Sequence, residues 1–132
     1  EIPTNRIQLE ITETFAVDIG AHAEANLALL KQAGFILALD DFGTGYTSLS
    51  QLVDYPLDVI KIDKSLVDRM VDTRGRDLVL SLIDFCKRQG FSVTVEGVET
   101  AEQAGLLTDG GADTLQGFYF FKPQPLEAFA DE

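Results

Sequence analysis

The chain has 132 residues, 45% of them hydrophobic, which is enough apolar material for one folded domain and too much for an intrinsically disordered protein. Its 22 acidic residues outnumber its 10 lysines and arginines, and the net charge of −12 opposes binding to polymeric nucleic acid or to an anionic membrane. No apolar stretch approaches the roughly 20 residues of a membrane span. The single cysteine, Cys86, cannot form a disulfide within the chain, and we expect it in the core.

Strand-like and helix-like patterns alternate along the chain. Ile7, Leu9 and Ile11 recur with the period of a strand, and Gly34 and Gly90 stand where C-terminal caps of helices are expected. In chain order we expect strands at residues 6–12, 35–39, 59–63, 91–95 and 113–119, and helices at residues 21–32, 49–52, 65–70, 77–89, 101–107 and 125–129. Alternation of this kind favours an α/β fold in which helical crossovers connect the strands of a parallel sheet.

Polar or charged residues recur near the ends of the expected strands. They are Glu10, Asp40, Lys61, Glu96 and Gln116. Because the carboxyl ends of parallel strands lie on one side of a sheet, we expect these side chains to converge there, where open α/β sheets and β/α barrels both place their functional sites. A solvated boundary residue is a sufficient explanation for one acid at a strand end, but a poor one for a recurrent set.

Two adjacent acids, Asp40 and Asp41, follow the apolar run of the second expected strand. Two carboxylates about 4 Å apart repel each other by about 4 kcal/mol at an effective dielectric constant near 20, so the pair needs a proton, a basic group or a metal cation. Gly43 and Gly45 behind them permit a tight loop. The alternative is an ordinary turn, in which Asp, Gly and Thr serve only as turn formers.

Carboxylate oxygens without histidine or cysteine partners suit Mg²⁺ or Mn²⁺ better than zinc. Two such ions would polarise a phosphoryl group and activate water for in-line attack, with Asp40 as the natural bridge between them. Lys61 could then hydrogen-bond the attacking water or neutralise charge in the transition state. The alternative for Lys61 is a strand lysine whose side chain extends to solvent. We expect neither a metal-binding nor a catalytic role for the single histidine, His22.

Five ordered segments resemble the signature motifs of the EAL domain family. They are LEITET at residues 9–14, DDFGTGYTSL at 40–49, VIKID at 59–63, VEGVET at 95–100 and QGFYFFKP at 116–123. The resemblance implies an EAL-type modified (β/α)8 TIM barrel, of which residues 1–132 would form the C-terminal portion, about strands 4–8 with their helices. The N-terminal strands, with the E-A-L segment and a metal-binding asparagine, would lie upstream of this portion.

The same resemblance implies an enzyme of bacterial signalling, a phosphodiesterase that hydrolyses the second messenger cyclic di-GMP to pGpG with two Mg²⁺ or Mn²⁺ ions, in biofilm and motility regulation. Carried over by position, the metal ligands are Glu10, Asp40, Asp41 and Glu96, and the catalytic residues are Lys61 at the water and Glu99 and Gln116 near the second ion. Glu13 would anchor the glycine-bearing loop, and Asp63 would be a further acid of the site. Phe118 stands where many members of the family have tyrosine.

The resemblance also implies partners and a location. We expect a homodimer formed through the loop after Asp41 and nearby helices, and fusion to sensor or GGDEF-type domains. We expect a cytoplasmic location, which in a membrane-anchored parent protein would be that of its cytoplasmic part. The alternative to an enzyme is a non-catalytic module that binds cyclic di-GMP or contacts other proteins. We expect the 132 residues alone to be inactive and to self-associate, because a half barrel leaves sheet edges and apolar area exposed.

Overall fold

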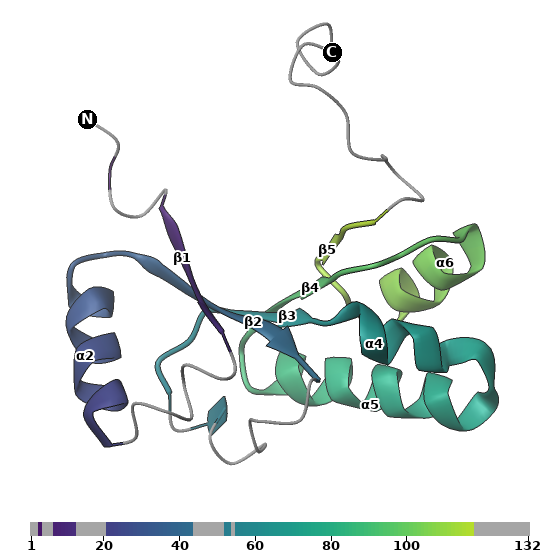
Figure 1. Cartoon of the computed structure of the whole chain (residues 1–132), viewed down its shortest axis with the longest axis horizontal. Helices are drawn as coiled ribbons and strands as arrows, with labels where there is room; N and C mark the ends of the chain where they lie inside the picture. The colour runs from purple at the N-terminus through teal and green to yellow at the C-terminus, as the bar shows by residue number, and fades with distance from the viewer. Residues whose placement is uncertain (1–2, 4–6, 13–20, 44–51, 54, 118–132) are drawn as a thin grey trace, which may run out of the picture.

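A computed structural model of the chain describes residues 3, 7–12, 21–43, 52–53 and 55–117, and for residues 21–24 it describes the backbone only. The helices and strands of this part are shown in Figure 1. The strands are β1 (Gln8–Thr12), β2 (Ile36–Phe42), β3 (Val59–Ile62), β4 (Ser92–Val95) and β5 (Thr114–Leu115). The helices are α2 (Ala21–Gln32), α4 (Lys64–Val67), the 3-10 helix η2 (Asp68–Val71), α5 (Thr73–Arg88) and α6 (Ala101–Asp109).

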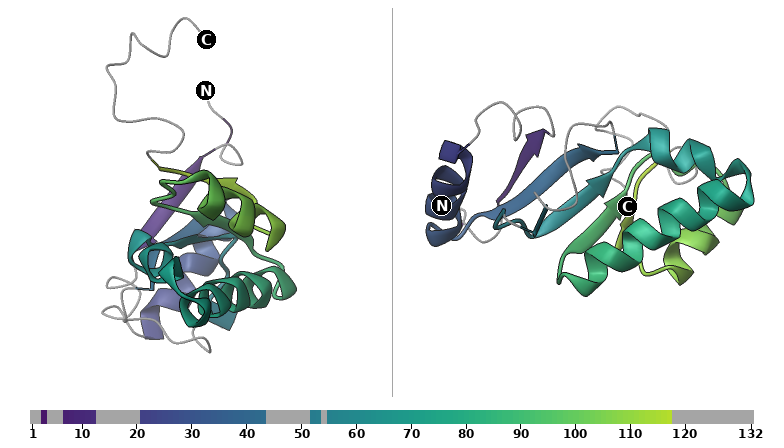
Figure 2. Two further views of the ribbon diagram at one scale, coloured as in Figure 1. Left: turned by 90° about the vertical axis from the view of Figure 1, so that its right-hand side faces the viewer. Right: turned by 90° about the horizontal axis from the view of Figure 1, so that it is seen from below.

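The strands form one five-stranded parallel sheet in which each strand pairs with the next one along the chain. A doubly wound sheet reverses its strand order at a switch point, whereas a β/α barrel adds strands in sequence order. The observed order, β1-β2-β3-β4-β5, is therefore that of a barrel segment. Figures 1 and 2 show α2 beside the β1–β2 end of the sheet and α4, α5 and α6 beside the β3–β5 end.

The core is built where the central strands meet the apolar face of α5. Leu37 and Leu39 of β2 and Ile60 of β3 are fully buried, as parallel strands covered on both faces require. From α5, Ile83 and Cys86 pack into the same cluster. The expectation of a core cysteine is thus confirmed, and burial raises the pKa of the Cys86 thiol to about 11.

The helix expected over residues 77–89 begins earlier, at Thr73. The Asp72 carboxylate caps it by accepting a hydrogen bond of 2.7 Å from the Gly75 amide, so the polar first turn is helical without any apolar residue to mark it. Gly75 is required here, because a Cβ atom at this position would collide with the carbonyl oxygen of Arg69. The tight junction joins η2 to α5.

The last strand is shorter than expected, since Thr114 and Leu115 alone pair with β4. The backbone then leaves the ladder at Gly117, whose φ is 153°. Of the helix expected at 49–52, residue 52 falls in the described part and is helical, together with residue 53. The helix expected at 125–129 lies outside the described residues. No helix in the part of the chain that the structure describes has the length and apolar character needed to cross a bilayer.

Candidate functional site

Adjacent parallel strands bring the predicted site residues to one end of the sheet. Thr12 of β1 is in register with Asp40 of β2, and Lys61 of β3 is in register with Thr94 of β4. The β3–β4 ladder continues past its last pair, because the Glu96 amide donates a 3.0 Å hydrogen bond to the Ile62 carbonyl. Glu96 is therefore held beside the end of β3, next to the acids of β2.

Lys61 lies at the centre of this group. Its ammonium Nζ is 2.5 Å from Glu10 Oε1, 3.2 Å from Glu96 Oε1 and 3.8 Å from Asp40 Oδ1, and only 10% of its side chain is exposed. Burial alone would lower the pKa of Lys61, but hydrogen bonds to Glu10 and Glu96 and the nearby negative charge outweigh burial and raise it. The interpretation of Lys61 as a solvent-directed strand lysine is therefore wrong.

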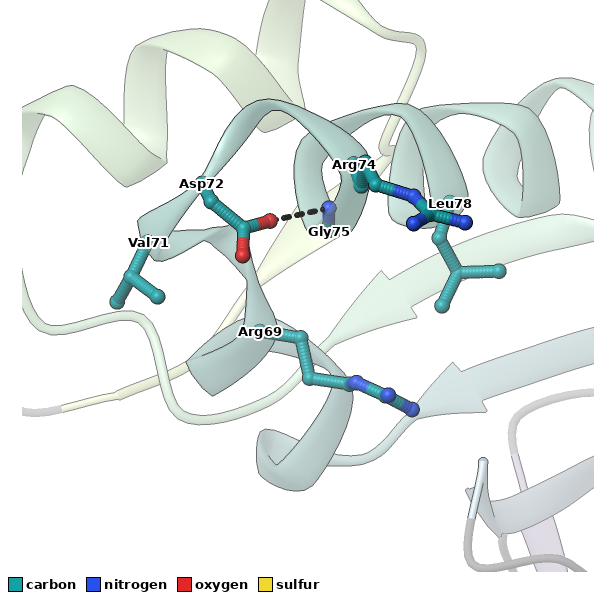
Figure 3. Close-up of a pocket in the computed structure, with 6 residues that line it drawn as sticks. All are labelled: Arg69, Val71, Asp72, Arg74, Gly75 and Leu78. Carbon is teal, nitrogen blue, oxygen red and sulfur yellow. Dashed lines mark hydrogen bonds between the residues drawn. The ribbon is translucent and has the colours of Figure 1, made fainter.

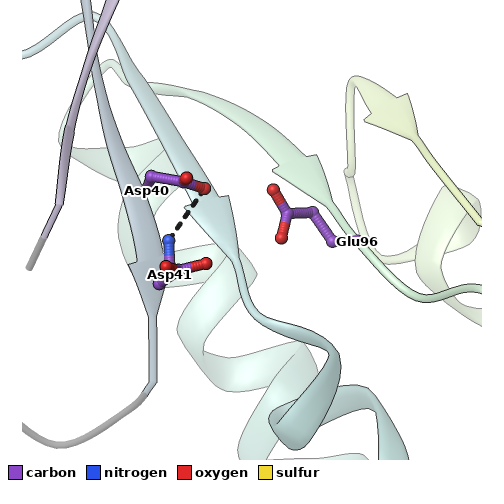
Figure 4. Close-up of side chains that lie close together, drawn as sticks. All are labelled: Asp40, Asp41 and Glu96. Carbon is purple, nitrogen blue, oxygen red and sulfur yellow. Dashed lines mark hydrogen bonds between the residues drawn. The ribbon is translucent and has the colours of Figure 1, made fainter.

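Asp40, Asp41 and Glu96 form a compact group of carboxylates, shown in Figure 4. Each offers one oxygen, and these oxygens all lie within 4.8 Å of one another. Burial, followed by the charges of Asp40 and Asp63, raises the pKa of Asp41. Burial, followed by the interaction with Asp40, also raises the pKa of Glu96 despite its contact with Lys61. In both residues burial is the larger cause of the raised pKa and the neighbouring carboxylates add to it, while Lys61 acts in the opposite direction.

The backbone of Asp41 explains how two neighbouring residues contribute to one group. In a regular strand, successive side chains point to opposite faces of the sheet. Asp41 has a φ of 57°, and the register between β2 and β3 shifts between Leu39 and Phe42. The Asp41 amide, turned by this irregularity, donates a 3.0 Å hydrogen bond to Asp40 Oδ1. A left-handed aspartate is an uncommon conformation that persists where the surrounding structure fixes it, and such residues cluster at functional sites.

The donor set fits a divalent cation. Asp40, Asp41, Glu96 and nearby Glu10 supply four carboxylates, and Lys61 supplies one positive charge among them. Hard oxygen donors of this kind prefer magnesium, manganese or calcium over zinc. Glu10 is not part of the three-carboxylate group, and its carboxylate accepts a hydrogen bond from Lys61.

A pocket of about 320 Å³ adjoins the carboxylate group. It is lined by Lys64, Glu96, Gly97, Glu99, Gln116 and Gly117. Gln116 is positioned by its backbone, whose amide donates to the Val95 carbonyl and whose carbonyl accepts from the Val98 amide. The structure thus places Glu99 and Gln116 together beside Glu96.

Asp63 has a different position from the other acids. Its carboxylate caps α4 by accepting a 2.9 Å hydrogen bond from the Ser65 amide, and it also interacts with Asp41. Burial would raise the pKa of Asp63, but the hydrogen bonds from Ser65 lower it. Asp63 is therefore engaged at the start of α4 as well as with Asp41. Glu13, Phe118 and the loop residues 44–48 lie outside the described residues.

Lys64 is a residue of this site that the sequence reasoning missed. Its ammonium donates 3.0 Å hydrogen bonds to both oxygens of Asp68 and lies 3.3 Å from Glu99 Oε1. Hydrogen bonds to Asp68 and to Glu99 raise the pKa of Lys64. Its position directly after the VIKID segment was the available signal.

A larger cavity, of about 590 Å³, lies between η2 and the first turn of α5 (Figure 3). It is lined by Arg69, Val71, Asp72, Arg74, Gly75 and Leu78. Its one carboxylate, Asp72, is engaged as the cap of α5, and none of the predicted site residues lines it. This cavity is therefore separate from the carboxylate group at the strand ends.

Comparison with known sequences finds the EAL domain model matching residues 1–123. Biofilm architecture maintenance protein MbaA of Vibrio cholerae is 42% identical over 91% of this chain and 15% of its own length. Cyclic di-GMP phosphodiesterase RocR of Pseudomonas aeruginosa is 37% identical over 98% of this chain and 33% of its own length. Cyclic di-GMP phosphodiesterase PdeL of Escherichia coli is 38% identical over 96% and 35%, respectively. The chain thus spans between 15% and 35% of the length of these relatives.

Solved structures give the same assignment. The PaMucR phosphodiesterase in complex with c-di-GMP is 31% identical, with a TM-score of 0.87 over 97% of this chain and 52% of that one. A manganese and cyclic di-GMP complex of BlrP1 from Klebsiella pneumoniae is 34% identical, with a TM-score of 0.82 over 89% of this chain and 30% of that one. A calcium complex of BlrP1 with the same nucleotide is also similar, with a TM-score of 0.84. The sequential parallel sheet, the acids at its strand ends and the family match over residues 1–123 together show that the chain belongs to the EAL domain family.

Proposed function

We propose that this chain carries metal-binding and water-orienting residues of a phosphodiesterase that hydrolyses cyclic di-GMP to pGpG. The observation that carries the proposal is the position of Lys61, held by Glu10, Asp40 and Glu96 at the carboxyl ends of adjacent strands. RocR and PdeL, which cover nearly the whole chain, are named as cyclic di-GMP phosphodiesterases. PaMucR, which has the same fold over this length, is described in complex with the nucleotide.

The metal part of the proposal assigns Asp40, Asp41, Glu96 and Glu10 to two Mg²⁺ or Mn²⁺ ions, with Asp40 between them. Support comes from the oxygen-only donor set and its excess negative charge, and from the BlrP1 complexes with manganese and with calcium. Bound ions would polarise the phosphoryl group and lower the pKa of the attacking water. Glu10, whose carboxylate contacts Lys61, would be the fourth residue to hold an ion in this assignment.

Lys61 acts as a hydrogen-bond donor in the proposed reaction. The carboxylates around it favour the charged ammonium, which donates protons in hydrogen bonds and accepts none. We assign it to orienting the attacking water and to balancing the negative charge that grows on the phosphoryl oxygens. The water oxygen bonds to phosphorus as the water loses one proton, one phosphodiester P–O bond breaks, the leaving oxygen takes up one proton, and the ring opens to linear pGpG.

The remaining site residues have supporting roles in the proposal. Glu99 and Gln116 border the pocket beside Glu96, where they would bind the water shell of the second ion. Asp63, whose carboxyl group interacts with that of Asp41, would be a further acid of the site. The anchoring role of Glu13 stays a prediction, because this residue lies outside the described part.

The proposal extends to architecture and partners. We propose that residues 1–132 act as the C-terminal portion of one EAL domain, which agrees with the 52% coverage of the PaMucR chain. The expected homodimer through the loop after Asp41 falls largely on residues outside the described part and stays a prediction, as does fusion to sensor or GGDEF-type domains. The relatives are larger proteins, of which the chain covers 15% to 35%.

The test is a product assay on the full-length protein that carries this chain. Cyclic di-GMP is incubated with and without Mg²⁺ or Mn²⁺, and products are separated by chromatography. Metal-dependent formation of pGpG supports the proposal. Binding of the nucleotide with no product under any metal would favour the non-catalytic, nucleotide-binding alternative. Neither binding nor product would overturn the proposal and would leave the alternative of a module that contacts other proteins.

A further inference from the structure

Lys64 is fixed at the edge of the carboxylate site by packing as well as by charge. It follows Asp63 at the first position of α4, and its aliphatic stem lies over Gly97. A Cβ atom at position 97 would collide with the Lys64 Cγ atom and would lie 2.5 Å from its Cβ atom. Gly97 has a φ of 79°, so the backbone of the loop after β4 comes as close to the Lys64 stem as a residue without a side chain allows.

The ammonium group of Lys64 connects two carboxylates from different elements. It hydrogen-bonds to both oxygens of Asp68, one helical turn further along, and it contacts Glu99 in the loop between β4 and α6 at 3.3 Å. The Glu99 backbone is fixed separately, because its amide donates a 2.8 Å hydrogen bond to the Gln103 side chain in the capping box of α6. The backbone of Glu99 is thus held by α6 and its side chain by α4.

Glu99 is thereby kept apart from the carboxylates that could hold a metal ion. It lines the same pocket as Glu96, only three residues away in sequence, yet the oxygens that lie within 4.8 Å of one another come from Asp40, Asp41 and Glu96 among the described residues. A free carboxylate in this position would be attracted to any divalent cation bound nearby. The contact with Lys64 competes with that attraction.

We propose that Lys64 is a positioning residue that restrains the Glu99 carboxylate at the rim of the site and withholds it from direct metal coordination. The inference rests on the metal-binding part of the proposed function. Lys61 also engages a carboxylate that borders the group of three, Glu10, but unlike Lys64 it contacts two members of the group as well. The direction of the Lys64 effect is distinctive, because loss of an ordinary supporting residue weakens metal binding, whereas loss of Lys64 strengthens it.

The test measures Mn²⁺ affinity by calorimetry in the full-length protein and its Lys64→Ala, Lys64→Arg, Glu99→Gln and Lys64→Ala/Glu99→Gln variants. We expect Lys64→Ala to bind Mn²⁺ about 3- to 5-fold more tightly, the scale on which an exposed ion pair competes. Lys64→Arg, which keeps the cation, should bind as the wild type does. In the Glu99→Gln background the added effect of Lys64→Ala should fall to less than twofold, since the restrained carboxylate is gone.

A matched control distinguishes restraint of Glu99 by Lys64 from the general effect of removing a positive charge. Arg74→Ala removes a cation from the larger cavity between η2 and α5, and it should leave Mn²⁺ affinity unchanged. Unchanged or weaker Mn²⁺ binding in Lys64→Ala would overturn the inference. The inference would also fail if Lys64→Ala raised Mn²⁺ affinity equally in the Glu99→Gln background, or if Arg74→Ala raised it by the same factor, because loss of a positive charge would then explain the tighter binding. Circular dichroism of each variant confirms that it is folded.

Kinetics give a second readout that separates this inference from the proposed function. With cyclic di-GMP as substrate, Lys64→Ala should change KM more than kcat, and Lys64→Arg should restore KM. A wild-type protein that binds Mn²⁺ but does not hydrolyse the nucleotide would refute the proposed function, while the Mn²⁺ affinities would still decide the role of Lys64. A wild-type protein that binds no Mn²⁺ would overturn both.

Discussion

Replacing Lys61 by alanine removes an ammonium that contacts three carboxylates at once. At an effective dielectric constant of about 20, a pair of unit charges 3.2 Å apart, the Lys61–Glu96 distance, interacts by about 5 kcal/mol, and the pair with Asp40 at 3.8 Å by about 4 kcal/mol. Desolvation of the buried ammonium offsets much of this. Because Asp40 and Glu96 are each 23% exposed, we expect a loss of about 2–4 kcal/mol in the metal-free free energy of unfolding.

The catalytic effect of the same change should be larger than its effect on substrate binding. In the full-length protein with saturating Mn²⁺, kcat for cyclic di-GMP hydrolysis should fall about 10²- to 10³-fold, the range for loss of one donor to a developing charge. KM should change only a few-fold, since the proposed contact is to the water and the transition state. Lys61→Met, which keeps most of the aliphatic stem in β3, should show the same reduced kcat as Lys61→Ala with a smaller loss of stability.

A second lysine serves as the matched control for stability. Lys31 is paired with Asp58, which also accepts a hydrogen bond from the Leu37 amide, away from the carboxylate group. Lys31→Ala should lower the free energy of unfolding by about 1 kcal/mol or less and leave kcat unchanged. A Lys61→Met enzyme with kcat within threefold of the wild type would refute the role assigned to Lys61.

Three further predictions concern the metal, the β4–β5 edge and the core. Hydrolysis by the full-length protein should be at least about tenfold slower with Ca²⁺ than with Mg²⁺, because calcium accepts longer and looser coordination; equal turnover, followed by product chromatography, would count against the two-metal reading. Asp113→Asn should lower stability by about 1 kcal/mol at pH 7, because Asp113 accepts hydrogen bonds from Lys87 and from the Val93 amide, which lower its pKa. The lowered pKa of Asp113 in the folded protein stabilises the fold only above the unfolded-state pKa near 4. The difference in unfolding free energy between Asp113→Asn and the wild type should therefore shrink as the pH falls from about 4 through the folded-state pKa. A difference that stays constant in acid unfolding curves would contradict this prediction. The Cys86 thiol should resist alkylation at pH 8 until the protein unfolds, because it is buried and its pKa is raised to about 11.

The positions of the strands were predictable because each has a local signal. Runs such as Ile36–Leu39 and Val59–Ile62 are short and largely apolar; Gly34 separates the first from the preceding helix, and Pro56 stands before the second. The parallel arrangement followed from the alternation of strands and helices, and with it the convergence of Glu10, Asp40 and Glu96. The convergence of these side chains depends only on the order and direction of the strands, so it could be predicted from the sequence.

The finer geometry of the site depends on contacts that no local pattern encodes. The left-handed backbone of Asp41 arises with a register shift between β2 and β3, which is a property of the pair of strands. The engagement of Glu99 by Lys64 joins residues 35 positions apart, through a close approach at Gly97. The early start of α5 was missed for a different reason. Its first turn is polar and has no periodic apolar residues that would indicate a helix.

The most direct test of the metal centre is a Mn²⁺ binding isotherm of the full-length protein and its Asp40→Asn variant. If the acids at the strand ends hold two ions with Asp40 between them, the wild type should bind two Mn²⁺ per chain, and Asp40→Asn should weaken both sites by at least about tenfold. A wild-type protein that binds no Mn²⁺, or an Asp40→Asn variant that binds two ions as tightly as the wild type, would contradict the account.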